Sequence, residues 1–220
     1  AGYLAFRIGR EDRSAADGVP TYVFNQMSCR FVPCLDSVDA VISLAPLPSI
    51  ESVVKMAQSL GAKRIIAFGS TGRFSKVGST SAIERDFVVQ QERAEALFFM
   101  ECEAAGMGWT LFRPTMIYGA DADQNVCFIK SIIRKFGFFP VPIGASGLRQ
   151  PVHVDDLADA CVSALGCKTT INRAYNLGGG ELLGYQEMVK RIFLAEGKRP
   201  VLIPIPKALF SLLIGITQKF

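Results

Sequence analysis

Hydroxyl groups lie at the ends of two apolar segments that the sequence predicts as strands. Ser70 and Thr71 follow the run AKRIIAFG within 62–70, and Tyr118 is near the end of WTLFRPTMIYG (109–119). A serine or threonine hydroxyl can hydrogen-bond a substrate oxygen, and a phenol can donate a proton to one. Ser70 and Thr71 could equally close the turn that follows a strand. These residue types leave both interpretations open.

Strand-like and helical segments alternate through the first two thirds of the chain, which predicts an α/β fold. We expect strands at 21–25, 30–35, 39–47, 62–70 and 109–119, and helices at 49–61 and 84–105. Strands separated by helices of this length need crossover connections, so the sheet should be parallel and covered on both faces. Ligands of such sheets bind at the carboxyl ends of the strands. SLAPL, FGSTG and RPTMIYG should therefore meet at one edge.

The pattern becomes mixed after residue 120. CFIKSIIRKFG, VDDLADACVSALG and LGYQEMVKRIFLAEG have helical patterns, while FFPVPIG and RAYNL are short and extended. The run GGG at 178–180 follows one of these strands and precedes a helix, and we interpret it as a turn. We expect a sheet domain at 1–120 and a mixed substrate region at 121–220 that is interleaved with the sheet.

The composition argues against several classes of protein. The 220 residues carry a formal charge of +4, and the basic residues are scattered along the sequence, unlike those of a nucleic-acid binder. The six cysteines form no C-x-x-C pair and there is one histidine, so we expect no metal site. Scattered cysteines indicate buried thiols in a reducing compartment, here the cytoplasm, more than a disulfide framework.

Neither end of the sequence predicts a membrane span. The opening AGYLAFRIGRED lacks the apolar core of a secretory signal. The apolar run at 201–216 is interrupted by Pro204 and Pro206, and the apolar segment after Pro206 is too short to cross a bilayer. We interpret this run as a core-packing helix, with a membrane-surface helix as the alternative.

Seven motifs occur in an order that resembles a known family. They are AGYLA (1–5), PCLD with Asp36, SLAPL, FGST, FRPTMIYG, LRQPVHVDDLADA and AYNLGGGELLGYQEM. In this order the chain resembles the extended short-chain dehydrogenase/reductase superfamily, in its NAD-dependent epimerase/dehydratase branch. The resemblance implies a Rossmann-type doubly wound parallel sheet with a small C-terminal annex. It also implies one more strand before Ala1, so we expect this sequence to be part of a longer protein.

The resemblance implies a nicotinamide dinucleotide cofactor. The residues it assigns are Gly2, Tyr3, Leu4 and Ala5 in the pyrophosphate loop, Asp36, Ala45 and Pro46 at the adenosine, and Pro114 and Ile117 under the nicotinamide. The alternative for the N-terminal loop is a frayed end, and the alternative for Asp36 is an acid that closes a turn. For Ala45 and Pro46 the alternative is ordinary packing at the end of a strand. NAD is usually preferred where an acid at the end of a strand binds the ribose 2′-hydroxyl. The strand TYVFN ends instead in the neutral Asn25, and Arg30 is close enough in sequence to approach a 2′-phosphate. We therefore expect NADP ahead of NAD.

The family's acid–base residues are a Ser or Thr, a Tyr, and a Lys four residues after the Tyr on one helix. An acid often follows after four more residues, and Glu95 matches it, which places Gln91 at the lysine position and Phe87 at the tyrosine position. Phe87 has no proton to exchange and Gln91 has no charge. The standard mechanism is therefore lost, although Gln91 could still hydrogen-bond a ribose hydroxyl. Tyr118 is the nearest replacement proton donor, with Ser70 or Thr71 at the remaining catalytic position.

Two residues of the LRQPVHVDDLADA motif have polar chemistry of interest. Arg149 matches an arginine that related enzymes place on the substrate's phosphates, with a solvated surface charge as the alternative. His153 belongs to the family's H-V-D-D stretch, where a structural role is expected, and Asp155 and Asp156 resemble helix caps.

Two functions remain open. The first is an epimerase/dehydratase-like enzyme for a sugar nucleotide or another hydroxyl or carbonyl substrate, with a non-standard acid–base group. The second is a catalytically silent NAD(P)-binding scaffold, sensor or accessory subunit, as in respiratory complex I. We expect a small-molecule substrate or a protein partner, with a homodimer as one candidate assembly, and neither nucleic acid nor a transmembrane segment.

Overall fold

The computed structural model describes residues 7–9, 21–25, 30–32, 37–120, 123–145, 147–206 and 208–210. The chain divides into two compact units, each built from two parts of the sequence. The first unit comprises Ala1–Phe112 and Ser163–Tyr175, and the second comprises Arg113–Val162 and Asn176–Phe220.

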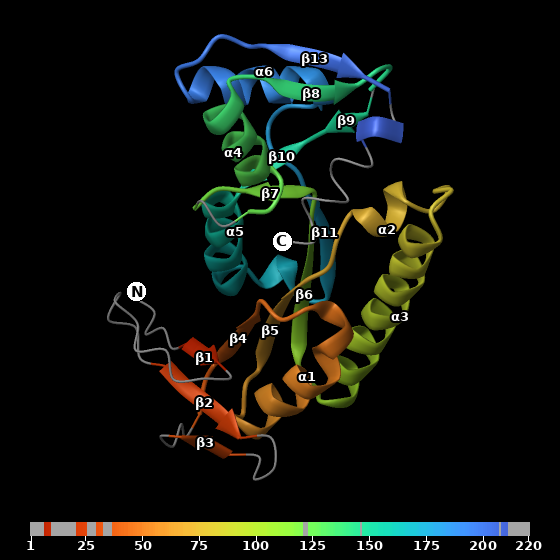
Figure 1. Cartoon of the computed structure of the whole chain (residues 1–220). Helices are drawn as coiled ribbons and strands as arrows, with labels where there is room; N and C mark the ends of the chain where they lie inside the picture. Colours follow the sequence, from red (N-terminus) through yellow and green to blue (C-terminus); the bar gives the residue numbers. More distant parts are fainter. Residues whose placement is uncertain are drawn as a thin grey trace. The chain divides into compact units, whose positions relative to one another are not determined.

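The first unit contains the predicted sheet, whose strands have the order β11–β6–β5–β4 (Figure 1). The strands are β4 (Ala40–Ser43), β5 (Arg64–Phe68), β6 (Gly108–Pro114) and β11 (Arg173–Leu177). β4 pairs with β5 and β5 with β6 in parallel, as predicted, and Ser43 lies opposite Ala67. The carboxyl ends of β4 and β5 therefore meet at one edge.

Helices α1 (Ile50–Ser59) and α3 (Ala82–Ala104) pack against this sheet (Figure 1). Their buried residues recur every three or four positions, and they form one core with residues of the strands. This core includes Ile50, Val54, Ala57, Ile65, Ala94, Phe98, Cys102 and Leu111. The helices are followed by Gly61 and Gly106, whose positive φ angles of 68° and 61° suit the predicted helix stops.

A hairpin replaces two strands that the sequence predicts in the parallel sheet. β2 (Thr21–Asn25) and β3 (Arg30–Val32) pair antiparallel in a separate sheet with β1 (Arg7–Gly9). The prediction of a parallel arrangement is therefore wrong for this pair. Only four residues connect the two strands, which is too few for a crossover connection.

The predicted strand at 109–119 is broken into two. β6 ends at Pro114, and β7 (Met116–Tyr118) pairs in parallel with β10 (Pro151–His153) instead. The break occurs at Thr115, whose backbone N–H donates to the carbonyl of Leu177 and whose hydroxyl donates to the carbonyl of Gln150.

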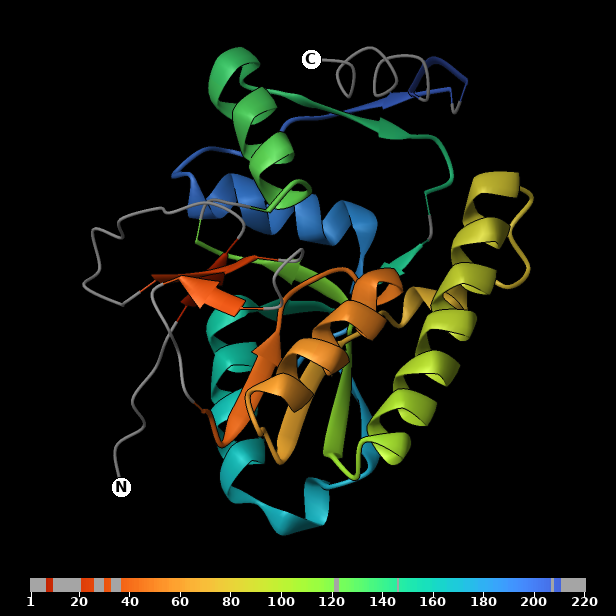
Figure 2. The same cartoon turned by 90° about the horizontal axis from the view of Figure 1, so that it is seen from below.

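The second unit packs α4 (Val126–Phe136) and α6 (Tyr185–Ala195) around its own core (Figure 2). Its further strand pairs are β8 (Phe139–Pro142) with β13 (Leu202–Ile205), and β9 (Leu148–Arg149) with β12 (Leu183–Gly184). α5 (Val154–Gly166) continues from this unit into the first, with Asp155 and Asp156 in its first turn as predicted. Short helical turns complete the elements: η1 (Leu47–Ser49), α2 (Gly72–Ser75) and η2 (Lys168–Thr170).

The apolar run at 201–216 begins as a strand, not as the predicted helix. Residues 202–205 form β13, and residues 208–210 are helical. The rest of the run lies outside the described residues. No helix in the described ranges combines the length and the apolar character that a bilayer crossing requires.

Two cysteines match the prediction of buried thiols. Cys102 and Cys161 are buried, and burial raises the pKa of their thiols to about 12 and about 11. Cys167 is exposed, so the prediction does not extend to it, while Cys29 and Cys34 lie outside the described residues.

Replacing Phe98 tests the core of the first unit. The ring is fully buried and lies 5.9 Å from Trp109, the single tryptophan of the chain. Phe98→Ala should lower the free energy of unfolding by about 3–5 kcal/mol, because it removes buried contacts and leaves a cavity. Urea unfolding followed by Trp109 fluorescence measures this loss. Met100→Ala on the same helix is the control, since Met100 is 66% exposed; equal losses in the two variants would contradict this core assignment.

Candidate functional site

Several predicted site residues lie at the carboxyl edge of β4 and β5. Ala45 and Pro46 follow β4, and Pro46 immediately precedes η1. Ser70 and Thr71 follow β5, and Thr71 caps α2. The parallel pairing of the two strands brings these two connections to the same edge, as the sequence predicts.

The Ser70 hydroxyl closes the turn after β5. Its oxygen accepts a hydrogen bond from the backbone N–H of Gly72 at 3.0 Å. This is the turn-closing role that the sequence leaves open for Ser70. The hydroxyl proton is still available for donation, so the bond does not exclude contact with a ligand oxygen.

Phe87 lies beside this turn. A Cβ atom on Gly72 would be 3.0 Å from Cε1 of Phe87 and 3.1 Å from Oγ of Ser70. Glycine therefore permits the close approach of the turn to the ring. The Phe87 ring, which the sequence analysis matches to a tyrosine, thus lies next to Ser70 but has no phenolic oxygen.

Gln91 and Ser43 carry buried polar atoms near this edge. Gln91 is on the same helix face as Phe87, one turn later, and α3 contacts η1. Oε1 of Gln91 and Oγ of Ser43 are both buried, and no described residue provides either with a hydrogen-bond partner. Buried polar atoms in native proteins nearly always have a partner, so both atoms fit donors of a bound ligand or water.

The acid at the third position of this face is compensated by a residue that the sequence analysis missed. Glu95 is 1% exposed, and its carboxylate accepts a hydrogen bond from the guanidinium of Arg73 on α2. Arg73 also lies 3.6 Å from Glu92. A buried carboxylate needs a cation, but the sequence does not say which cation supplies it.

Lys76 is a second residue that the sequence analysis missed. Its Nζ lies 5.3 Å from the centre of the Phe87 ring and 3.0 Å from a carboxylate oxygen of Glu84. The other Glu84 oxygen accepts a hydrogen bond from the Ser79 hydroxyl at 2.5 Å. The bonds from Ser79 and Lys76 hold the pKa of Glu84 below its usual value, so the carboxylate stays ionised and fixes the ammonium group.

Four more predicted site residues, Pro114, Ile117, Tyr118 and Arg149, belong to the second unit. Pro114 is buried at the end of β6, while Ile117 is 39% exposed on β7. Arg149 is exposed on β9, where Nη1 donates to the carbonyl of Leu148 and the guanidinium lies 5.8 Å from the ring of Tyr185. None of the described carboxylates forms an ion pair with Arg149.

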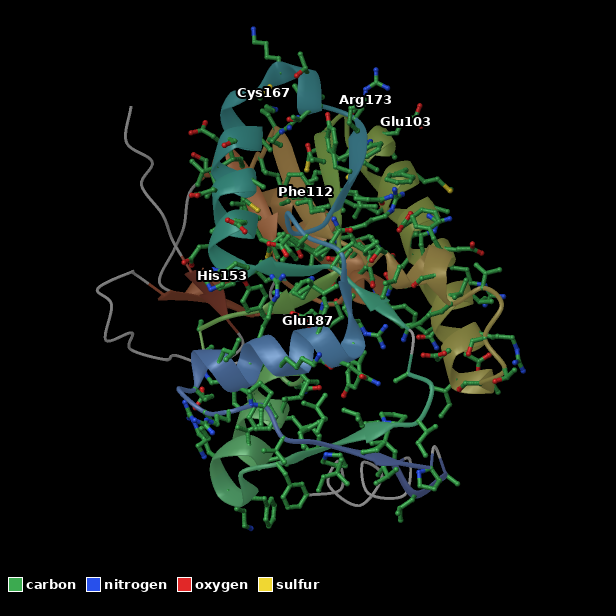
Figure 3. All side chains as sticks on the ribbon, turned by 90° about the horizontal axis from the view of Figure 1, so that it is seen from above. Glu103, Phe112, His153, Cys167, Arg173 and Glu187 are labelled. Atoms are coloured by element: carbon green, nitrogen blue, oxygen red, sulfur yellow. The ribbon has the colours of Figure 1, made fainter. Side chains whose placement is uncertain are left out.

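Tyr118 lines a cavity of about 620 Å³ in the second unit. Its ring meets the ring of His153 edge-on, with centres 5.0 Å apart. Figure 3 shows His153 beside α6, which carries the labelled Glu187. α4 and α6 add Lys130, Met188 and Arg191 to the lining. Tyr118 is the only predicted catalytic residue that contributes to this cavity.

The GGG run is a closely packed turn. A Cβ on Gly179 would lie 1.8 Å from the carbonyl oxygen of Pro151, and Gln150 Nε2 donates to the Gly179 carbonyl at 2.8 Å. Only glycine allows this approach, which supports the predicted turn.

Some predictions fall where side chains are not described. Gly2, Tyr3, Leu4, Ala5 and Asp36 lie outside the described residues. Asn25 and Arg30 are described as backbone alone, and they pair directly opposite each other in the β2–β3 hairpin. Within the described ranges, no group of three or more His, Cys, Asp and Glu side chains could hold a metal ion.

Two curated relatives are similar to part of the chain. UDP-glucose 4-epimerase of Vibrio cholerae is 25% identical over 166 residues, which are 70% of this chain and 50% of that protein. The mitochondrial NADH dehydrogenase [ubiquinone] 1 alpha subcomplex subunit 9 of Arabidopsis thaliana is 30% identical over 102 residues, 45% of this chain and 25% of that protein. The chain thus spans half or less of the length of these two relatives. No family model matches it.

Solved structures share the fold. UDP-N-acetylglucosamine 4-epimerase from Bacillus cereus matches with a TM-score of 0.67 and 15% identity, over 90% of this chain and 77% of that one. UDP-glucuronic acid 4-epimerase from Bacillus cereus in complex with NAD matches with a TM-score of 0.63 and 14% identity, over 77% and 63%. The chain is thus similar in sequence to the Vibrio cholerae epimerase and shares the Rossmann-type α/β fold of the epimerase structures, in agreement with the resemblance that the motifs predict.

Proposed function

We propose that the chain binds a nicotinamide dinucleotide at the carboxyl edge of β4 and β5. The observation that carries this proposal is the pair of buried polar atoms, Oγ of Ser43 and Oε1 of Gln91, without partners among the described residues. Such an atom costs about 1–3 kcal/mol when it stays unsatisfied, and a ribose hydroxyl can donate to either oxygen. The NAD complex among the structural neighbours supports the same cofactor class.

The preference for NADP remains a proposal that rests on the β2–β3 hairpin. Its register sets Arg30 directly opposite Asn25, at the end of the strand where NAD-binding members carry an acid. An arginine at this place suits a 2′-phosphate better than a free hydroxyl.

The proposed reaction is epimerase- or dehydratase-like, on a sugar nucleotide or another hydroxyl or carbonyl substrate. The bound nicotinamide would supply reversible hydride transfer. Arg149 supports a phosphate-bearing substrate, because its exposed guanidinium has no carboxylate partner among the described residues and can present two parallel N–H donors. The neighbours' sugar-nucleotide substrates support the same class.

Lys76 is the residue that we propose as the non-standard proton donor. Phe87 has no proton to give, and Lys76 holds its ammonium group over the Phe87 ring, beside the turn of Ser70. Its ammonium group carries three N–H donors and no acceptor, so Lys76 suits donation to a substrate oxygen more than proton abstraction. Tyr118 is the second candidate donor.

The alternative is a catalytically silent member that retains the cofactor. Two observations favour it: an apolar ring occupies the tyrosine position, and Arg73 already neutralises Glu95. The accessory-subunit relative supports a protein partner for such a member. A homodimer is a further candidate assembly.

Gln91→Ala tests the cofactor site. The variant should bind NADPH or NADH about tenfold more weakly, because it loses one buried hydrogen bond worth about 1–1.5 kcal/mol. Cofactor fluorescence during titration of the purified chain measures the affinity. Gln90→Ala is the matched control, since Gln90 is exposed on the same helix. Absence of binding by the unaltered, folded chain would overturn the proposal, and unchanged affinity in Gln91→Ala would remove Gln91 from the site.

Lys76→Met tests the proton donor. If the chain turns over a UDP-sugar, we expect kcat to fall at least about tenfold while cofactor affinity is unchanged, since general acid catalysis contributes about 10²–10⁴-fold. Lys55→Met is the control, because Lys55 is also an exposed lysine paired with a glutamate. Full turnover in Lys76→Met would exclude Lys76 and direct attention to Tyr118.

Restoring the family's residues separates the enzyme from the silent member. Phe87→Tyr combined with Gln91→Lys places a phenol beside Ser70 and a cation one turn later. If the chain is silent, the double variant should gain reductase activity in a spectrophotometric NAD(P)H assay, with little change in cofactor affinity. A folded double variant that loses an existing turnover would instead support the enzyme with a non-standard donor.

A further inference from the structure

An exposed aromatic turn follows α4 in the second unit. Phe136 and Phe138 flank Gly137, which ends the helix with a φ of 74°, and their ring centres are 6.0 Å apart. The two side chains are 56% and 37% exposed. Val201, 47% exposed, lies beside Phe138 because the backbone N–H of Phe139 donates to the Val201 carbonyl. Three apolar side chains are therefore presented to solvent together.

Basic residues surround this turn from two segments that are far apart in sequence. Lys198 donates from Nζ to the carbonyls of Ile133 and Arg134 at 2.9 and 3.1 Å, which ties the loop after α6 to the end of α4. Lys135 lies 5.2 Å from the centre of the Phe136 ring. Arg199 follows Lys198 and is exposed.

The two segments carry most of the chain's net charge. Residues 133–139 and 196–201 contain Arg134, Lys135, Lys198 and Arg199 against one acid, Glu196. Four cations and one carboxylate give +3, compared with +4 for all 220 residues. Glu196 is itself paired with Arg134 at 2.5 Å and with Lys130 at 3.8 Å. The surface formed by these two segments, here called the basic–aromatic turn, is thus positively charged around an apolar centre.

We propose that the basic–aromatic turn docks the chain onto the surface of an anionic lipid bilayer. Aromatic side chains favour the headgroup level of a bilayer, and lysine and arginine near them are attracted to anionic lipids. The exposed rings would enter the interface while Lys135 and Arg199 contact the headgroups. This binding is peripheral and needs no membrane-spanning helix. The turn contains none of the residues proposed here for the cofactor or the substrate.

A bilayer fits this surface better than nucleic acid does. Phosphate groups of either would satisfy the cations, but base recognition requires polar side chains that reach base edges, or rings that stack with them. The two segments contain no amide or hydroxyl side chain that could reach a base edge, so the turn offers only its two Phe rings to a base. Burial in the interfacial region of a bilayer removes all three apolar side chains from water.

Vesicle co-sedimentation of the full chain tests this proposal. We expect binding to vesicles of phosphatidylcholine with phosphatidylserine, little binding to phosphatidylcholine alone, and a loss of binding as salt is raised. Phe136→Ser with Phe138→Ser should weaken binding at least about tenfold, and so should Lys135→Glu with Arg199→Glu. Ile83→Ser with Met100→Ser is the matched control, because it removes two exposed apolar side chains on α3.

The outcomes separate this proposal from its competitors. All variants should keep the melting temperature and cofactor affinity of the unaltered chain, so a failure of the cofactor proposal would not affect the vesicle result. No binding to anionic vesicles at low salt would overturn the proposal, and so would an equal loss in the α3 control. Binding to single-stranded RNA without binding to vesicles would assign the basic–aromatic turn to nucleic acid instead.

Discussion

The buried ion pair of Arg73 and Glu95 is the interaction on which the candidate cofactor edge depends. A carboxylate that is 1% exposed is costly to bury without a partner, and Arg73 supplies that partner from the short helix α2. The pair therefore fixes α2 against α3. Because Ser70 precedes α2 and Phe87 belongs to α3, the same contact brings the serine turn and the ring together. Although Gln91, one turn before Glu95, carries no charge, Arg73 compensates the acid.

Much of the fold could be predicted because its signals are local. α1, α3 and α6 follow from apolar residues that recur every three or four positions, and β5 is a continuous buried run. The break at Thr115 could not be predicted, since its partners Gln150 and Leu177 are distant in sequence. The β2–β3 hairpin could have been predicted from its connection of only four residues. That length excludes a crossover whatever the surrounding pattern.

The candidate site also contains some residues that could be predicted from the sequence and others that could not. The shared face of Phe87, Gln91 and Glu95 follows from a spacing of four residues on one helix, so their chemistry was predictable. Arg73 and Lys76 were not predictable, because their importance comes from contacts between α2 and α3. Composition shows how many cations a chain has, but only the fold shows which of them lie near a given carboxylate or ring.

The fold also concentrates the chain's positive charge on one surface. Its basic residues are scattered in sequence, yet the hydrogen bonds of Lys198 to the end of α4 gather two basic segments around Phe136 and Phe138. A search of the sequence for runs of like charge does not detect such a surface, because its cations come from two separate segments. Its aromatic centre also distinguishes it from an ordinary solvated face, because water does not stabilise exposed rings. Positive charge alone would attract many anionic partners. Positive charge around an apolar centre favours a partner whose anionic groups cover an apolar interior, as the headgroups of a lipid bilayer do.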